Sequence, residues 1–399
     1  MPPKLLESAC MTTTDTLAPS IDMSESQKMV RDAAREFAEK RLKPTAQEHD
    51  EHEAIPRALY VEAAELGFLG VMFPEEYGGL GLDYVAYAIA MEELARGNAA
   101  FQVGVTVHNS LVCSGIIKFG TKEQKDLYLP KAAKGEWIGA YSLSEQGSGT
   151  DAGSLKCRAE DKGDHYLLNG TKAWVTNAGF ADFFLTFVST APELGNKGIT
   201  ALLVNKGLPG FTLGKKELKL GIKASDTREL IFKDCKVPKT QVVGKVNEGF
   251  KIAMTQLDNG RISIASQAVG IAQAAMEEAI AYAKQRKQFG KTLSEFQLTQ
   301  AKIAQMAMNI DAARLLTLRA ATMMSQGRKC TKEASMAKLF ASQMCNKVVF
   351  DAVQIHGGNG YVREFPVERY FRDARITEIY EGTSEVQHLI IAREVLGPR

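Results

Sequence analysis

The sequence predicts a multidomain α and β protein in which a helical domain, a β domain and a second helical domain follow one another. Three changes of pattern indicate this order. Apolar residues recur at helical spacing up to about residue 135, alternate in strand-like runs from Trp137 to about Gly244, and recur at helical spacing again from Phe250. The 399 residues are enough for two or three domains.

The composition is that of an ordinary globular protein. Hydrophobic residues make up 45% of the chain and charged residues 24%, and the net charge of +2 argues against a nucleic-acid partner. No apolar run approaches the ~20 residues of a membrane helix. The six cysteines are scattered without CxxC spacing, so no metal site is expected, and reduced thiols are the simplest interpretation.

Residues 1–21 form a leader that we interpret as a disordered tail or an added extension. The leader has no apolar core of signal-peptide type. It carries acidic residues and no arginine, so it makes a poor mitochondrial transit peptide. A bacterial cytoplasm is therefore the expected location, ahead of the mitochondrial matrix.

Residues 22–136 are predicted to form the N-terminal helical domain. The run YVAYAIAMEELA is apolar almost all round, which is typical of a buried helix, and Thr121 with Gln124 forms a capping box at the start of another. His108 is expected to be a core histidine. The run EHDEHE resembles a metal cluster, but charge runs of this kind are usually solvated.

Residues 137–245 are predicted to form the middle β domain. Runs such as ITALLV and ELIF have strand composition, and turn pairs separate them. The pair Asn169–Gly170, in YLLNGTKAWV, is the strongest of these hairpin-turn signals.

Residues 246–399 are predicted to form a C-terminal four-helix bundle. Four helical patterns follow one another here, the last from Ser384 to Leu396, and loops at RKQFGKT, SQGRKCT and HGGNGYVREFP separate them. Ser384 and Gln387 are expected to form a capping box for the last helix. The negative charge of Glu385 is favourable near the positive N-terminus of that helix.

Three segments have the composition of binding sites, and each also has a plainer interpretation. YSLSEQGSGTDAGS offers backbone N–H groups with Ser144 and Thr150 to a polar ligand, or is a solvated interdomain loop. Trp174 and Thr176 are expected on one face of a strand, because side chains alternate. The pair either binds a flat ring of a ligand or is an ordinary part of a half-buried sheet. The glycines of HGGNGY allow close backbone approach to a ligand, or belong to a loop between helices.

Glu381 has no structural explanation in the sequence. It follows Ile379 and Tyr380 and precedes Gly382, where the chain is able to turn a side chain inward. A helix N-terminus favours a nearby carboxylate by only ~0.3–1 kcal/mol, whereas burial raises its pKa by up to ~3–5 units. In a dry pocket Glu381 therefore becomes a candidate general base near neutral pH.

Six motifs in order resemble the acyl-CoA dehydrogenases, and the likeness covers nearly everything after Ile21. The motifs are YSLSEQGSGTDAGS, AWVTNAG, LDNGR, QRKQFGK, QIHGGNGY and IYEGTSEVQ. Each is weak alone, but their common order argues against chance. The resemblance implies a helical domain, a β-barrel-like middle domain and a four-helix bundle. The segments around LDNGR and IYEGTSEVQ look most like the short-chain (butyryl-CoA) branch.

The resemblance implies the chemistry. Glu381 removes the α-proton of an acyl-CoA thioester, and the β-hydrogen leaves as hydride to FAD, which gives a trans-2-enoyl-CoA. The backbone N–H of Glu381 and a ribityl hydroxyl of FAD stabilise the enolate charge on the thioester oxygen. The residues that the resemblance assigns to the substrate are Thr150, Asp258, Arg261 and Gly382.

The resemblance also implies which residues bind FAD. Arg286, Phe289 and Gln297 match residues that reach the FAD of a neighbouring subunit, which implies a homotetramer. The expected electron acceptor is electron-transferring flavoprotein. The other residues implied to bind FAD are Tyr141, Leu143, Ser144, Gly149, Thr150, Trp174, Val175, Thr176, Gln354, Gly357, Gly358, Thr383 and Glu385.

Two departures and two rival functions accompany the resemblance. Gln146 stands where many relatives have proline, and Gly260 occupies the position where isovaleryl-type relatives carry the base, which favours Glu381 here. An acyl-CoA oxidase or a desulfurisation-type flavin monooxygenase has the same fold, but the oxidases are usually much longer and the monooxygenases lack the glutamate. A non-catalytic scaffold subunit is the second rival.

Overall fold

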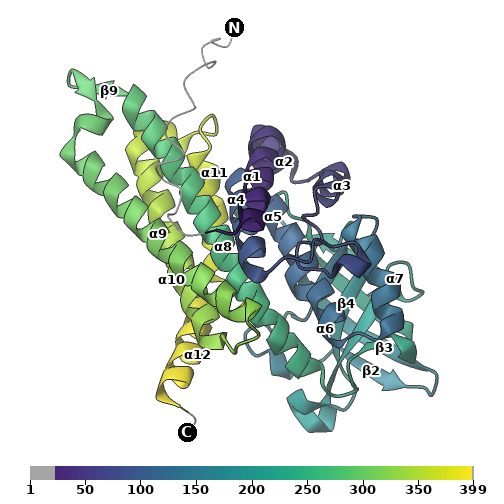
Figure 1. Cartoon of the computed structure of the whole chain (residues 1–399). Helices are drawn as coiled ribbons and strands as arrows, with labels where there is room; N and C mark the ends of the chain where they lie inside the picture. The colour runs from purple at the N-terminus through teal and green to yellow at the C-terminus, as the bar shows by residue number, and fades with distance from the viewer. Residues whose placement is uncertain (1–22, 398–399) are drawn as a thin grey trace.

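The computed structural model describes residues 23–397, and it confirms the predicted order of a helical, a β and a second helical domain. The sheet lies on one side and the long C-terminal helices on the other, with the N-terminal helices between them (Figure 1). Helix α8 (Gly249–Gln285) contacts the sheet, the N-terminal helices and the bundle in turn. The leader, residues 1–21, lies outside the described residues.

The N-terminal helices form where the apolar and capping patterns predict them. Thr121 Oγ1 accepts the N–H of Gln124 at 3.3 Å and Gln124 Oε1 accepts the N–H of Thr121 at 3.1 Å, which is the predicted capping box. The helices are α1 (Glu25–Phe37), α2 (Ala46–His52), α3 (Arg57–Glu65), α4 (Tyr84–Gly97), α5 (Ala99–Thr106), α6 (Ser114–Phe119) and α7 (Lys122–Ala133). Helix α4 is the predicted buried helix and packs between α1 and α8.

The helical segment Ala99–Phe119 corrects the expectation that no apolar run has membrane-helix length. It comprises α5, a π-helical turn (Val107–Cys113) and α6, and it is long and apolar enough to cross a membrane. Its most apolar stretch is 94% buried inside the protein, as in the core helix of a globular domain. His108 lies there as the predicted core histidine, because its Nδ1 accepts the N–H of Gly139 at 3.0 Å and burial lowers its pKa to about 4.

The middle domain is built on an 8-stranded sheet with the strand order β6-β7-β3-β2-β4-β5-β8, and β1 pairs with β4. Short 3₁₀ turns are the helical elements that interrupt it among the described residues. The strands are β1 (Gly139–Ser142), β2 (Arg158–Asp161), β3 (His165–Thr176), β4 (Phe183–Ser189), β5 (Ile199–Asn205), β6 (Phe211–Lys216), β7 (Thr227–Pro238) and β8 (Val242–Val243).

The predicted hairpin turn at Asn169–Gly170 is wrong, because both residues lie inside strand β3. The register of β3 against β7 shifts between Leu168 and Gly170, so the pair marks a bulge. Gly170 has a φ of 141° and packs against Cys157, where a Cβ atom would lie 2.7 Å from the Cys157 Cα. Glycine is therefore required by close backbone approach, which the sequence signal cannot distinguish from a turn.

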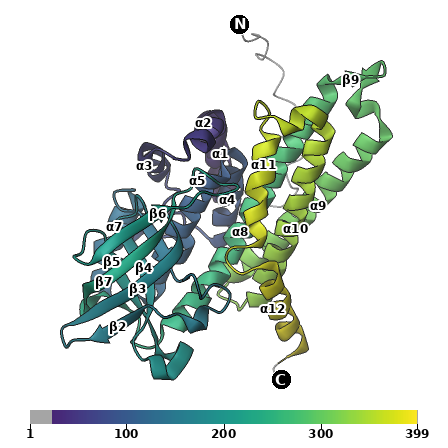
Figure 2. The same ribbon diagram turned by 180° about the vertical axis from the view of Figure 1, so that it is seen from behind.

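The C-terminal domain contains the four predicted helices, α8, α9 (Gln297–Ser325), α10 (Thr331–His356) and α12 (Ser384–Leu396). A small hairpin of β9 (Lys287–Gln288) and β10 (Lys291–Thr292) joins α8 to α9 at the outer end of the bundle. A fifth helix, α11 (Val367–Ala374), was not predicted and lies beside α8 and α10 (Figure 2). It is short and charged, so packing of its narrow apolar face determines its structure.

Helix α11 pins the loop between β6 and β7 to the C-terminal domain. The buried carboxylate of Asp373 accepts the N–H of Ile222, and Gly221 lies directly against the backbone of Arg372. Arg372 also pairs with Asp50 of α2 at 2.7 Å, so one helix holds all three domains. Asp50 belongs to the run EHDEHE, which here serves an ion pair between domains.

We expect Gly221→Ala to destabilise the protein. The new methyl group would overlap the backbone carbonyl of Arg372, which is unable to move away like a flexible side chain. Overpacking of this kind costs about 1–3 kcal/mol, so the Tm measured by thermal unfolding should fall by several degrees. Gly147→Ala is the control, since no atom lies within 4 Å of its added Cβ. Equal Tm values for the two variants would contradict the close approach.

Candidate active site

Glu381 lies in a strained turn before α12. Its φ is 53° and that of Gly382 is 95°, so two successive residues adopt the left-handed conformation. A non-glycine residue in this region is uncommon and is often found at functional sites. The following helix is capped by Thr383, whose side chain accepts the N–H of Val386 at 3.4 Å.

The predicted capping box of Ser384 and Gln387 is therefore wrong, because the N-cap lies one residue earlier, at Thr383. Ser384 is the first residue of α12, and its hydroxyl has no partner among residues 23–397. Gln387 turns back instead and donates from Nε2 to the carbonyl of Gly382 at 3.0 Å. It therefore braces the Glu381–Gly382 turn, and the sequence could not reveal this because the positive φ values shift the start of the helix.

The Glu381 side chain points at the backbone of α8 at Gly260. A Cβ atom on residue 260 would overlap Glu381 Oε2. The same oxygen is buried and has no hydrogen-bond partner within residues 23–397. A buried carboxylate oxygen without a partner is costly in a structural role, and it suits a group that must accept a proton from a ligand.

The surroundings raise the basicity of Glu381. Burial raises the pKa of Glu381 to about 7, and the positive charges of Lys338 and Arg261 oppose this rise. The pKa of Tyr141 is well above its ordinary value because of burial and, secondly, because of the charge of Glu381. Strand β1, which carries Tyr141, is therefore close to the carboxylate, and the structure brings these predicted residues together.

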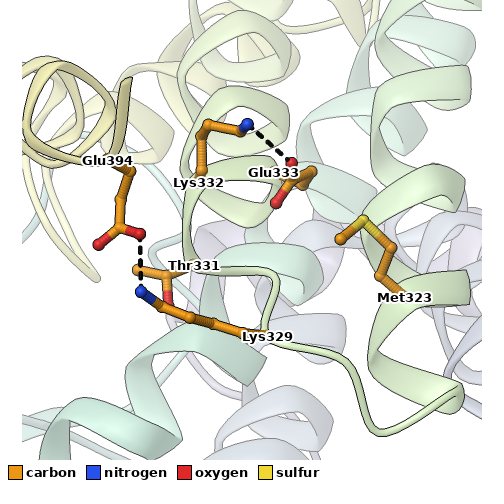
Figure 3. A pocket seen from close by; sticks show the side chains of 6 residues that line it. All are labelled: Met323, Lys329, Thr331, Lys332, Glu333 and Glu394. Carbon is orange, nitrogen blue, oxygen red and sulfur yellow. Dashed lines mark hydrogen bonds and ion pairs between the residues drawn. The ribbon is translucent and has the colours of Figure 1, made fainter. Parts of the chain in front are cut away.

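Arg261 and Asp258 form an ion pair on α8, one turn apart. Thr331, at the start of α10, donates to the second oxygen of Asp258 at 2.8 Å, so the pair is fixed in place. Thr331 also lines an open depression between α10, α12 and the end of α9 (Figure 3). Within it Lys329 pairs with Glu394 at 2.7 Å and Lys332 pairs with Glu333 at 3.3 Å, which leaves a locally balanced charge.

A buried lysine of strand β3 holds the loop that follows β1. Lys172 of β3, which is fully buried, donates to the carbonyl of Leu143 at 3.0 Å and to Glu145 at 2.8 Å. The carbonyl of Ser144 accepts the N–H of Ala173 at 2.9 Å. The predicted loop residues therefore sit on an ordered base, which favours a binding loop over a freely solvated one.

The strand next to this loop presents Trp174 outward. Trp174 has a φ of 61° at a bulge of β3 and is 55% exposed, Val175 is buried, and Thr176 is half-buried. Trp174 and Thr176 are thus the more accessible residues on either side of the buried Val175, although the bulge interrupts the register of the strand. In the neighbouring loop, a Cβ atom added to Gly149 would have no atom within 4 Å, and Thr150 is exposed.

These residues fit the isoalloxazine and pyrophosphate of FAD. A large exposed aromatic side chain held in a strained conformation suits a flat ligand, and a loop with open space over its glycine suits close approach of a phosphate. The Glu381 carboxylate, whose Oε2 has no partner within residues 23–397, lies near Tyr141 of the same group of residues.

The other predicted cofactor residues form a separate, exposed cluster at the outer end of the bundle. Tyr282, near the end of α8, links the hairpin that follows this helix to the end of α10. Its ring stacks on His356 at a centroid distance of 4.3 Å, and its hydroxyl accepts a hydrogen bond from Asn359 at 3.0 Å. The predicted residues there are Arg286, Phe289 and Gln297 around the hairpin, and Gln354, Gly357 and Gly358 at the end of α10. In one chain this cluster lies far from the sheet (Figure 1). Thr383 and Glu385 lie instead at the start of α12, beside Glu381.

Three supporting residues were not predicted. Lys172 and Glu145 hold the loop after β1, and Lys338 of α10 donates to the carbonyl of Gly382 at 2.7 Å. Lys338 had a signal in the sequence, because it falls on the same helix face as the buried Ala334 and Ala341. A lysine at such a position is buried only with a specific partner.

Comparisons with known proteins agree with this geometry. Models of the acyl-CoA dehydrogenase N-terminal, middle and C-terminal domains match residues 24–136, 140–235 and 247–396. The short-chain specific acyl-CoA dehydrogenase of Bos taurus, a mitochondrial protein, is 50% identical over 381 residues, which cover 96% of this chain and 92% of the relative.

Two solved structures are similar over almost the whole chain. Butyryl-CoA dehydrogenase from Megasphaera elsdenii has a TM-score of 0.93 and 43% identity, covering 95% of this chain and 100% of that one. A chain from the structure of the electron transferring flavoprotein of Acidaminococcus fermentans has a TM-score of 0.93 and 46% identity, with the same coverage. This chain therefore belongs to the acyl-CoA dehydrogenase family, whose members depend on FAD, and it lies with the short-chain members.

Proposed function

We propose that this enzyme oxidises a short-chain acyl-CoA to the trans-2-enoyl-CoA and that Glu381 removes the α-proton. The observation that carries the proposal is the Glu381 carboxylate, with a buried, partnerless oxygen opposite Gly260 and a pKa raised to about 7. A general base works best when its pKa lies near the working pH. The scaffold alternative leaves this buried carboxylate without a purpose.

The proton transfer that we propose uses groups of this chain. Glu381 accepts the α-proton, and negative charge develops on the thioester oxygen of the substrate. The N–H of Glu381 donates no hydrogen bond to the described part of the chain, so it is available to that oxygen. When bound, FAD supplies the acceptor for the hydride that leaves the β-carbon. In this proposal Arg261 orients the substrate, and its ion pair with Asp258, which Thr331 holds in turn, supports that role.

The FAD site that we propose combines both clusters of residues. The loop after β1 and the strand around Trp174 bind the isoalloxazine and pyrophosphate, with Thr383 and Glu385 beside them. The exposed cluster at the outer end of the bundle, which contains Arg286, binds the FAD of a second subunit in a homotetramer. The separation of the two clusters within one chain supports this division, because a single FAD held by one chain would need them together.

The electron acceptor that we propose is electron-transferring flavoprotein. The chain from the Acidaminococcus fermentans structure, which concerns that flavoprotein, supports this partner. Rapid reoxidation of the substrate-reduced enzyme by air, without stimulation by the flavoprotein, would favour an acyl-CoA oxidase instead. Bacterial relatives such as that of Clostridium acetobutylicum, 47% identical over 374 residues, support a location in a bacterial cytoplasm.

We expect Glu381→Gln to retain FAD and butyryl-CoA and to lose flavin reduction by ~10²–10⁴-fold, because loss of a general base commonly costs this much. In the unchanged enzyme kcat/KM should rise as the pH rises through about 7, since only the ionised carboxylate accepts a proton. Stopped-flow bleaching of the flavin measures both. Glu378→Gln is the control, because Glu378 lies in the same segment but pairs with Arg375 at 2.7 Å. Near-normal reduction in Glu381→Gln would disprove the assignment.

We expect kcat/KM to be higher for butyryl-CoA than for octanoyl-CoA or isovaleryl-CoA. Each buried CH₂ contributes ~0.8 kcal/mol while space exists, but overfilling a closed pocket costs ~1–3 kcal/mol. Activity should therefore fall gently for shorter chains and sharply for longer ones. Steady-state kinetics with an acyl series measures this, and an octanoyl value above the butyryl value would refute the short-chain preference.

We expect Arg286→Ala to weaken FAD retention roughly ten- to hundredfold without unfolding the protein, because it removes a charge-assisted contact to phosphate. Gel filtration with light scattering should show a tetramer, and the flavin absorbance per subunit should fall in the variant. Arg328→Ala is the control, since Arg328 is an exposed arginine in the other loop of α9. A monomer that holds FAD tightly would contradict the shared site.

A further inference from the structure

Lys338 is a charged residue in the interior of the C-terminal domain, and the proposed chemistry does not use it directly. It lies on α10 with none of its side chain exposed. Its ammonium group donates to the carbonyl of Gly382 at 2.7 Å. Among residues 23–397 it has no ion pair with a carboxylate, although a buried ammonium ordinarily requires one.

The carbonyl that Lys338 holds belongs to the turn that carries Glu381. Glu381 and Gly382 are both left-handed, and such a turn persists only when surrounding contacts impose it. Two donors converge on the Gly382 carbonyl, one from α10 (Lys338) and one from α12 (Gln387, at 3.0 Å). The direction of the Glu381 side chain therefore depends on these two contacts.

Lys338 also faces Glu381 electrostatically. Its positive charge is the largest influence that opposes the rise of the Glu381 pKa on burial, ahead of that of Arg261. In return Glu381 is the largest influence that raises the pKa of Lys338, which burial lowers to about 8. The other titratable or charged groups facing the two are Tyr87 of α4, Tyr141 of β1, Arg261 of α8, Tyr380, Glu378 and Glu385.

We propose that Lys338 is a positioning residue for Glu381, holding the strained turn by its hydrogen bond and keeping the carboxylate ionised by its charge. This inference rests on the proposed role of Glu381 as the base. A hydrophobic residue of similar length would fill the same space with less desolvation, so packing alone does not explain a lysine here. Its charge and its donor group are therefore the properties that matter.

Two substitutions separate these properties in the FAD-loaded enzyme. Lys338→Met removes both the charge and the donor, whereas Lys338→Gln removes the charge and keeps an N–H donor on a side chain that is one bond shorter. Lys347→Met is the matched control, because Lys347 lies on the same helix but pairs at the surface with Asp351 at 2.6 Å. The measurement is the pH dependence of flavin reduction by butyryl-CoA, with FAD content and Tm as checks of folding.

We expect the acid limb of the pH profile to move to higher pH by about one unit in both Lys338 variants and not in the control. Above the limb, Lys338→Gln should approach the unchanged rate, while Lys338→Met remains at least tenfold slower because its turn is no longer held. At pH 7, infrared spectroscopy should show a stronger protonated carboxyl band in Lys338→Gln than in the unchanged enzyme. The band should be lost when Glu381→Gln is added to the same protein.

An acid limb that stays in place in Lys338→Gln, with no added carboxyl band, would overturn the inference. The same conclusion follows if Lys338→Met reduces flavin as fast as Lys338→Gln at high pH. Failure of the proposed function looks different, because Glu381→Gln by itself would then still reduce the flavin. If Lys338→Met does not fold, the limb and the band of Lys338→Gln still decide the matter.

Discussion

Burial of the Glu381 carboxylate against the bare backbone of Gly260 is the constraint on which the rest of the site depends. A raised pKa means that the folded protein is less stable at alkaline pH than it would be with a neutral side chain. A rise from 4.5 to about 7 corresponds to a cost of about 3 kcal/mol above neutral pH. The surrounding contacts must offset that cost, and the left-handed turn adds strain to it.

Helix α8 provides the rigid frame for these contacts. At its start it packs on strand β5, about a third of the way along it carries Asp258, Gly260 and Arg261, and near its end it carries Tyr282. A site built on one long helix keeps its parts in fixed relation, even though the roles that we propose for them concern the substrate, the base and the hairpin at the outer end of the bundle. Helix α10 runs alongside and contributes Thr331 near its start and Lys338 a few turns later.

Two buried lysines have similar roles in different domains. Lys172 fixes the loop after β1 through the carbonyl of Leu143, and Lys338 fixes the turn of Glu381 through the carbonyl of Gly382. In each case an ammonium group holds a main-chain carbonyl of an irregular segment, which a hydrophobic residue is unable to do. The difference is that Lys172 has a carboxylate partner in Glu145, whereas Lys338 has only the more distant charge of Glu381.

The sequence by itself determined the order of the domains and the long helices, and it pointed to Glu381 as the candidate base, because these depend on local periodicity and on motifs. Only the tertiary structure decided the rest. Asn169–Gly170 is a bulge and not a turn because the backbone at Cys157 approaches Gly170 closely, and α11 exists because two long helices cover its apolar face. The N-cap of α12 is Thr383, and Lys338 binds the carbonyl of Gly382, because contacts between segments far apart in the chain overrule local preference.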